Sequence, residues 1–291
     1  MSETILPEPA SRHFFSQRLR LHYADWGNPE APPLLLLHGG HDHCRSWDWV
    51  AARLQRDWRV IAPDLRGHGD SQWSPDGGYP WHAYVYDLAQ LIDQLQLAPV
   101  TIIAHSFGGN IALRYTGTYP EKVRKIVAIE GLDPKNPQHG KPDRPIDQRL
   151  RDWIEARHRL AARSPRRYAS IEDGMKRMME QNSRLTAEQA RHLTVHGMNR
   201  NEDGSYGWKF DNYVRSGAPR DLPPADIEHL LGCIACPTLL VYGRQSWATN
   251  PTEDGRISHF RNAQVAAVDG AGHWVHHDRP DEFIGLLSKF L

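Results

Sequence analysis

The chain has 291 residues, of which 40% are hydrophobic, and its 35 Lys and Arg side chains balance 35 Asp and Glu. This balance gives no global attraction to nucleic acid or to an anionic membrane, so neither is expected as a partner. With three cysteines, no apolar run long enough to span a membrane and no secretory pattern in the first residues, a cytoplasmic protein is expected.

Short apolar runs bounded by turn residues predict buried, mostly parallel strands. The weakly alternating segment at residues 13–23 precedes them and predicts an antiparallel hairpin at the edge of the sheet. The six runs are Leu34–Leu37, Val60–Ala62, Val100–Ala104, Ile126–Ile129, Leu239–Tyr242 and Val265–Val268. Apolar stripes over residues 85–95 and 283–290 predict helices between and after these strands. Alternating strands and helices indicate the α/β class.

The interval between the strands that begin at Ile126 and Leu239 is too long for a single crossover helix. We therefore expect a core formed by residues 1–132 and 233–291, with a mainly helical insertion at residues 133–232. Helices are predicted over Ile146–Ala162 and Ile171–Gln181, and a capping box at Thr186 precedes a third. The arginine-rich stretch at residues 157–167 is expected to face solvent.

Aromatic and thioether side chains of the insertion are candidates for lining a pocket. Most of them are expected instead to pack the helices together, since large apolar side chains are usually buried. The candidates are Trp153, Tyr168, Met175, Met178, Met179, Trp208, Phe210 and Tyr213.

The most informative segment is residues 102–110, where an apolar run ends in Ala104, Ser106 and Gly108 at alternate positions. A small-x-Ser-x-Gly pattern between a strand and a helix is the sequence form of a nucleophile elbow. The small residues allow a turn tight enough to lift Ser106 above the sheet. Ser106 is therefore the predicted nucleophile.

A serine hydroxyl needs a base to take its proton, and the chain has 17 histidines. In folds with this elbow the base follows the last strand. His273 lies in a Gly-Ala-Gly-His loop directly after Val265–Val268 and is the predicted base. Structural roles are expected for His276 and His277.

The reaction places negative charge on the former carbonyl oxygen, and two backbone N–H groups must point at it. We expect one to come from Phe107, directly after the nucleophile. The other is expected from Gly40, in the His38-Gly39-Gly40 loop that follows Leu34–Leu37.

These motifs, in this order, resemble those of α/β-hydrolase fold enzymes that carry a helical cap. The resemblance covers the His-Gly-Gly loop, residues 64–71, the elbow and the loop that holds His273. It implies a mostly parallel sheet flanked by helices, with an inserted helical cap and a Ser–acid–His triad. It also implies that residues 64–71 form a structural loop, whose charges we expect to pair with each other.

The acid departs from the family pattern, which most often has Asp in a Gly-x-x-Asp turn where this chain has Gly243 and Ser246. Glu130, directly after Ile126–Ile129, is the predicted acid. Haloalkane dehalogenases of one subgroup are similar in having a Glu there. The alternative role for Glu130 is structural: a carboxylate at the end of a strand that forms an ion pair with an arginine. The reserve candidates for the acid are Asp254, Glu253 and, less favoured, Asp133.

Neither a cofactor nor a metal is expected, because the chain shows no phosphate-binding loop and the spacing of His38, His41 and His43 matches no metallo-hydrolase motif known to us. We expect His41, Asp42 and Cys44 to lie at the pocket entrance instead. Cys233 and Cys236 are expected to be buried thiols.

The sequence thus predicts a serine hydrolase that cleaves a small, largely apolar ester or related acyl substrate through an acyl-enzyme on Ser106. Two alternatives remain open at this point. The same site also suits non-ester chemistry such as carbon–carbon bond hydrolysis, perhydrolysis or a lyase reaction. The missing Asp also leaves open a ligand-binding or signalling module with weak turnover.

Overall fold

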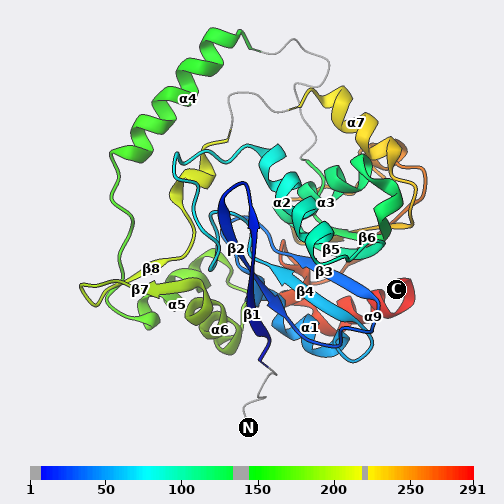
Figure 1. The fold of residues 1–291 in the computed structure, drawn as a ribbon, viewed down its shortest axis with the longest axis horizontal. Coiled ribbons are helices and arrows are strands. Elements are labelled where there is room, and N and C mark those ends of the chain that lie inside the picture. The colour runs from blue at the N-terminus through cyan, green and yellow to red at the C-terminus, as the bar shows by residue number, and fades with distance from the viewer. Residues whose placement is uncertain (1–7, 134–143, 218–221) are drawn as a thin grey trace.

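The computed structural model describes residues 8–133, 144–217 and 222–291. Its main sheet consists of β1 (Ala10–Ser16), β2 (Leu19–Asp25), β3 (Pro33–Leu37), β4 (Arg59–Pro63), β5 (Val100–His105), β6 (Val123–Ile129), β9 (Thr238–Gly243) and β10 (Ala263–Val268). The strands lie in the order β1-β2-β4-β3-β5-β6-β9-β10 (Figure 1). Pairing is antiparallel for β1 with β2 and for β2 with β4, and parallel for the other neighbours. The mostly parallel α/β sheet predicted from the sequence is confirmed.

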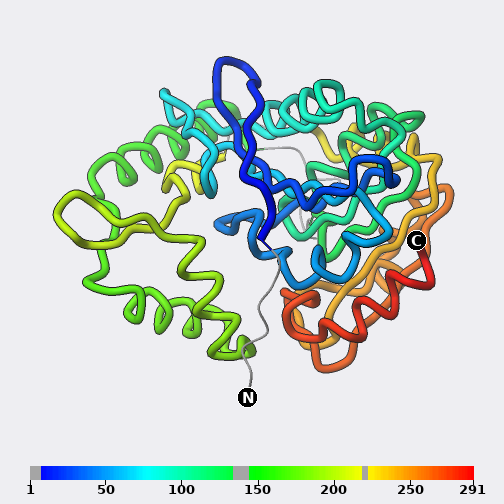
Figure 2. The backbone as a smooth tube through the Cα atoms, turned by 60° about the horizontal axis from the view of Figure 1, so that its bottom comes forward, coloured from blue at the N-terminus to red at the C-terminus, as the bar shows by residue number. Residues whose placement is uncertain are grey.

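Helices cover both faces of this sheet, as Figures 1 and 2 show. One face carries α2 (Trp81–Gln94), α3 (Ser106–Thr118) and α7 (Pro224–Cys233). The other carries α1 (Asp48–Leu54) and α9 (Pro280–Phe290), and the short α8 (Val275–Asp278), which directly precedes α9, contributes Val275 to the same core.

The apolar run of β3 shows why such strands lack an alternating pattern. Leu35 and Leu37 belong to the hydrophobic core under α2 and α3, whereas Leu34 and Leu36 belong to the core under α1 and α9. Successive side chains of a strand point to opposite faces, so a strand buried on both sides is apolar throughout.

The segment between β6 and α7 forms a separate lobe (Figures 1 and 2). It contains α4 (Ile146–Ala161), α5 (Ile171–Gln181), α6 (Ala187–Gly197) and the two-stranded β7 (Met198–Arg200) and β8 (Tyr206–Trp208). The predicted helices agree with α4 and α5 to within one residue, and α6 starts with the predicted capping box of Thr186 and Gln189.

The division of the chain into core and cap stays a proposal. α7 was expected in the cap, but it packs against α3 so closely that a Cβ on Gly117 would lie 2.3 Å from the carbonyl oxygen of Leu230. A cap that ends before Pro224 therefore fits the packing better than one that extends to Gly232.

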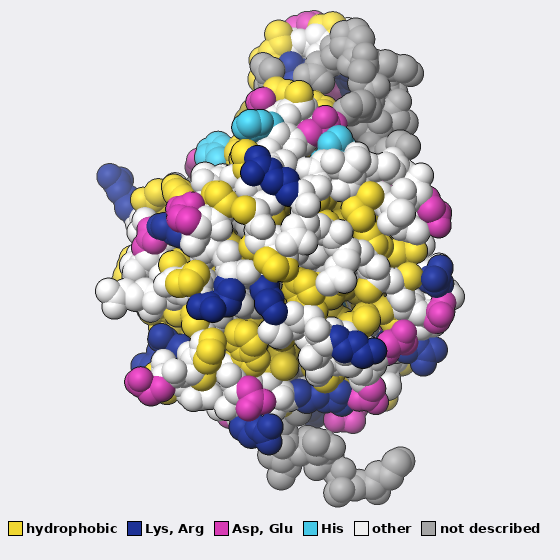
Figure 3. Space-filling view, turned by 90° about the vertical axis from the view of Figure 1, so that its right-hand side faces the viewer, with side chains coloured by type: hydrophobic (Ala, Val, Ile, Leu, Met, Phe, Trp, Pro, Cys, Tyr) yellow, Lys and Arg dark blue, Asp and Glu magenta, His cyan; other side chains and the backbone are white. Residues whose placement is uncertain are grey.

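The surface on the side of α7 and α9 shows no separation of charge. Figure 3 shows basic and acidic side chains interspersed there among apolar ones. No helix within the described parts of the chain is long and apolar enough to cross a membrane.

Several histidines lie in the interior, and for most of them burial lowers the pKa because the charged form loses its hydration. The pKa falls from 6.5 to about 4 for His38 and His43 and to about 3 for His68 and His277. In the unfolded chain these groups take up protons near pH 6.5.

These buried histidines predict an acid-sensitive fold. As the pH falls from 6.5 towards 4, the unfolded chain binds protons that the folded protein does not, so the folded state is destabilised. Each buried neutral histidine contributes about 1 kcal/mol of this loss per pH unit. We expect the urea midpoint to fall steeply between pH 6.5 and 5; an unchanged midpoint would show that these rings are protonated in the folded protein.

Candidate active site

Ser106 lies at the junction of β5 and α3 with a φ of 50°, in the left-handed region that non-glycine residues rarely adopt. The turn is tight because neighbouring backbone approaches it. A Cβ on Gly108 would lie 2.3 Å from the carbonyl oxygen of His38, so only glycine fits there. This is the strand-to-helix geometry of a nucleophile elbow.

His273 lies in the loop after β10, with its ring against the elbow. Its Nε2 is 3.0 Å from Ser106 Oγ. The ring nitrogen Nε2 of His105, at the end of β5, donates a hydrogen bond of 2.9 Å to the carbonyl oxygen of His273. The elbow strand therefore holds the backbone of the loop that carries this ring.

Glu130 directly follows β6, the strand adjacent to β5, and has a φ of 48°. Its side chain is fully buried, and Oε2 lies 2.5 Å from His273 Nδ1. A proton on Nδ1 bonded to this carboxylate leaves Nε2 as an acceptor for the Ser106 hydroxyl. The structure thus brings the three predicted residues together in one relay, Ser106–His273–Glu130.

Two further donors hold the Glu130 carboxylate. The Gly243 N–H donates to Oε1 at 2.9 Å, and the Ser246 hydroxyl donates to Oε2 at 2.7 Å. Ser246 occupies the position where the family most often has its acid. Here it supplies a hydrogen bond to a carboxylate that comes from the neighbouring strand. Glu130 has no arginine among these partners, unlike the alternative considered from the sequence.

The reserve acid candidates are bonded elsewhere. Asp254 pairs with Arg256, and Asn250 donates to Glu253. Asp133 accepts hydrogen bonds from Asn110 and Arg114.

The predicted oxyanion donors lie beside Ser106. A Cβ on Gly39 would lie 3.2 Å from Ser106 Cβ, and one on Gly40 would lie 3.9 Å from Phe107 Cβ, so this loop lies directly against the elbow. The Phe107 N–H belongs to the first turn of α3, where backbone donors have no partner within the helix.

His38 fixes the orientation of that loop. Its Nδ1–H donates to the Gly39 carbonyl at 2.7 Å, and its Nε2 accepts the Leu65 N–H at 3.0 Å. In a trans peptide the Gly39 carbonyl and the Gly40 N–H point in opposite directions. Holding the carbonyl with His38 therefore also sets the direction of the Gly40 N–H.

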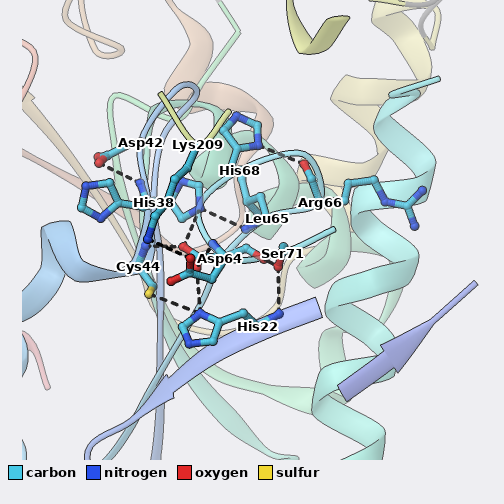
Figure 4. Close-up of polar contacts among 12 residues, drawn as sticks. His22, His38, Asp42, Cys44, Asp64, Leu65, Arg66, His68, Ser71 and Lys209 are labelled. Carbon is cyan, nitrogen blue, oxygen red and sulfur yellow. Dashed lines mark hydrogen bonds and ion pairs between the residues drawn. The ribbon is translucent and has the colours of Figure 1, made fainter. Parts of the chain in front are cut away.

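The loop of residues 64–71 holds the His38 ring through the Leu65 N–H, as Figure 4 shows. The buried Asp64 carboxylate accepts bonds from the His22 ring and the Cys44 N–H, both at 2.7 Å. We expected the charges of this loop to pair with each other, and that expectation was wrong. Arg66 pairs with Asp87 on α2, and Asp70 pairs with Lys209. The loop is thereby tied to two other parts of the molecule.

Potential metal ligands gather in two places within the described residues, His22 with Cys44 and Asp64, and Asp48 with His192 and His196.

The predicted location of Cys44 at the pocket entrance was wrong, since it is 1% exposed and packs in the core. All three cysteines are free; Cys236 is buried and Cys233 partly so.

A cavity of about 520 Å³ lies between Gly40–Asp42 and the cap. Four of the cap candidates, Tyr168, Met178, Trp208 and Phe210, line it. The thioether side chains of α5 also pack against the small cluster of apolar residues inside the cap, as most were expected to do.

Sequence reasoning missed the arginines of this cavity. Arg166 and Arg167 line it although their stretch was expected to face solvent only, and Arg177 and Arg215 join them from other cap segments. Their side chains remain partly or largely exposed. A local sequence pattern does not separate an arginine at a cavity wall from one on an open surface, since both are partly solvated.

Comparisons with known proteins identify the family to which the chain is similar. A family model described as "alpha/beta hydrolase fold" matches residues 32–280. The sn-1-specific diacylglycerol lipase ABHD11 of Mus musculus is 27% identical over 91% of this chain and 82% of its own length. Esterase YbfF of Escherichia coli is 24% identical over 89% and 92%. The crystal structure of E-2-(acetamidomethylene)succinate hydrolase has a TM-score of 0.79 at 23% identity and covers 97% and 98%.

Replacing Glu130 by Gln tests its part in the relay. The amide keeps the shape of the side chain but has no charge to stabilise an imidazolium, so turnover should fall by about 10³–10⁴-fold. Glu253→Gln, on the exposed loop after β9, is the matched control and should retain near-normal turnover. Circular dichroism and thermal unfolding check that both variants fold. Normal turnover by a folded Glu130→Gln protein would remove Glu130 from the triad.

Proposed function

We propose that this chain, which belongs to the alpha/beta hydrolase fold family, is a serine hydrolase that cleaves small-molecule esters or related acyl compounds through an acyl-enzyme on Ser106. The observation that carries the proposal is the relay of Ser106 Oγ, the His273 ring and the Glu130 carboxylate. The names of the two relatives given above, an esterase and a lipase, support a hydrolase.

The first half of the reaction forms the acyl-enzyme. Ser106 Oγ attacks the substrate carbonyl while His273 Nε2 takes the hydroxyl proton. The buried Glu130 carboxylate stabilises the imidazolium that results. The Gly40 and Phe107 N–H groups stabilise the oxyanion, and loss of one such donor typically costs about 3–4 kcal/mol of transition-state stabilisation. As the tetrahedral intermediate collapses, His273 returns its proton to the leaving alcohol.

The second half releases the acyl group. A water molecule replaces the departed alcohol, gives a proton to His273 Nε2 and attacks the ester carbonyl on Ser106. Collapse of this second intermediate frees the carboxylic acid and returns the proton to Ser106. The same donors stabilise both intermediates, so no further residue is required.

Non-ester chemistry in the same site is the second candidate. The structural similarity to E-2-(acetamidomethylene)succinate hydrolase is the observation that favours it, since that name does not describe an ester. At 23% identity this similarity carries the fold alone, whereas the curated relatives above are named as an esterase and a lipase. Ester hydrolysis is therefore the primary proposal.

A fluorophosphonate probe tests the nucleophile directly. Because only an activated serine attacks the phosphorus at an appreciable rate, intact-mass analysis should show one adduct on the wild-type protein. Ser106→Ala should give none, whereas Ser258→Ala, in the short 3-10 helix Arg256–His259 that precedes β10, should react like the wild type. An adduct that persists on Ser106→Ala, or its absence from the folded wild type, would contradict the proposed role of Ser106.

A further inference from the structure

We propose that the cavity under the cap binds the part of the substrate remote from the scissile bond, and that this part carries a carboxylate or phosphate group bound by Arg215 and Arg166. The inference rests on the proposed function for the reacting end of the substrate. It revises the expectation of a largely apolar substrate.

The wall of the cavity carries an excess of positive charge. Four arginines line it, Arg166, Arg167, Arg177 and Arg215, against Asp42 as the carboxylate on the same wall. Burial raises the pKa of Asp42 to about 7, so at neutral pH part of this negative charge is absent as well. A chain with no net charge thus concentrates positive charge at the cavity next to its candidate active site.

Two of these arginines are already neutralised within the cap. Arg167 pairs with Asp203 at 2.6 Å, and Arg177 pairs with Glu180 at 2.9 Å. Arg166 and Arg215 differ, because each has its guanidinium over an aromatic ring rather than against a carboxylate.

The two rings belong to the same cavity wall. The Arg166 guanidinium lies 5.4 Å from the centre of the Tyr168 ring, and that of Arg215 lies 5.6 Å from the centre of the Phe210 ring. Neither arginine has a carboxylate within ion-pair distance among the described residues. A guanidinium stacked on a ring keeps its N–H edge free to bind the two oxygens of an anion.

Arg215 is also connected in space to the proposed oxyanion donor. Its guanidinium lies over Phe210, and the Phe210 ring centre is 4.8 Å from that of His41, the residue after Gly40. The pKa of His41 is lowered to about 4, mainly by loss of hydration and secondly by the positive charge of Arg215. An acyl chain that starts at Gly40 and follows this wall therefore ends within reach of Arg215.

Amide side chains add uncharged hydrogen-bond donors to the cavity wall. Asn199, Asn201 and Asn212 line the cavity beside the arginines. A wall of aromatic faces, amides and guanidinium groups suits an acyl chain that is apolar in its middle and anionic at its end.

A matched pair of substrates tests the proposal. Mono-4-nitrophenyl adipate and 4-nitrophenyl hexanoate have acyl chains of equal length, and only the adipate ends in a carboxylate. We expect kcat/KM to favour the adipate by about tenfold or more, mainly through KM, since an arginine–carboxylate contact acts equally on bound substrate and transition state. Added NaCl should reduce the preference, because these arginines are partly exposed.

Variants assign the preference to particular side chains. Arg215→Met and Arg166→Met should each lower the ratio of kcat/KM for the adipate to kcat/KM for the hexanoate, and the double variant should bring this ratio close to one. Arg215→Lys should restore part of the preference by keeping the charge. Arg159→Met is the matched control, because Arg159 lies on α4, pairs with Glu155 and does not line the cavity. Equal hydrolysis of both esters by the wild type, insensitive to salt, would overturn the proposal.

Direct binding separates failure of this proposal from failure of the proposed function. Ser106→Ala is expected not to turn over substrate, and the tryptophans that line the cavity, Trp73, Trp208 and Trp274, should report ligand binding through their fluorescence. Titration with adipate and with inorganic phosphate at constant ionic strength shows which anion binds. Binding that is lost with Arg215→Met supports the subsite even if neither ester is hydrolysed. Ester hydrolysis without any anion binding would leave the function standing and contradict the subsite.

Discussion

The buried carboxylate of Glu130 is the constraint on which the arrangement of the site depends. A charge removed from water is costly unless hydrogen bonds replace its hydration. Glu130 receives donors from three separate parts of the fold: the Gly243 backbone, the Ser246 hydroxyl and the His273 ring. Satisfying this one group therefore fixes the ends of β6 and β9 and the loop after β10 relative to each other. The position of His273, and with it the direction of Nε2, follows.

Close backbone approaches complete the positioning. A Cβ on Gly131 would lie 2.6 Å from Gly109 Cα, so the first turn of α3 lies directly against the residue that follows Glu130. Both Ser106 and Glu130 have positive φ, at the ends of adjacent strands. Strained backbone persists only where its surroundings hold it, and it is concentrated at functional sites. Here the turn at Ser106 and the turn at Glu130 hold each other through the close contact of Gly109 and Gly131.

The sequence predicts those features that depend on local pattern. Apolar runs and their spacing give the parallel strands, and the small residues around Ser106 and His273 reveal the tight turns that carry these two side chains. Glu130 was predicted as the acid from its place after a strand, because carboxyl ends of parallel strands meet at one edge of the sheet. The role of Ser246 as a donor to that carboxylate was not predictable, since it joins residues more than a hundred positions apart. The arginines of the cavity were missed for the same reason: their common wall exists only after the cap has folded.

The central claim is that Glu130 acts on the reaction through His273, and a double-mutant cycle tests it most directly. Residues that act as one unit have non-additive effects on turnover. His273→Ala should leave a slow but measurable residual rate, and adding Glu130→Gln to it should lower that rate no further. If the double variant instead loses activity by the product of the two single effects, Glu130 acts independently of His273, and the proposed triad is wrong.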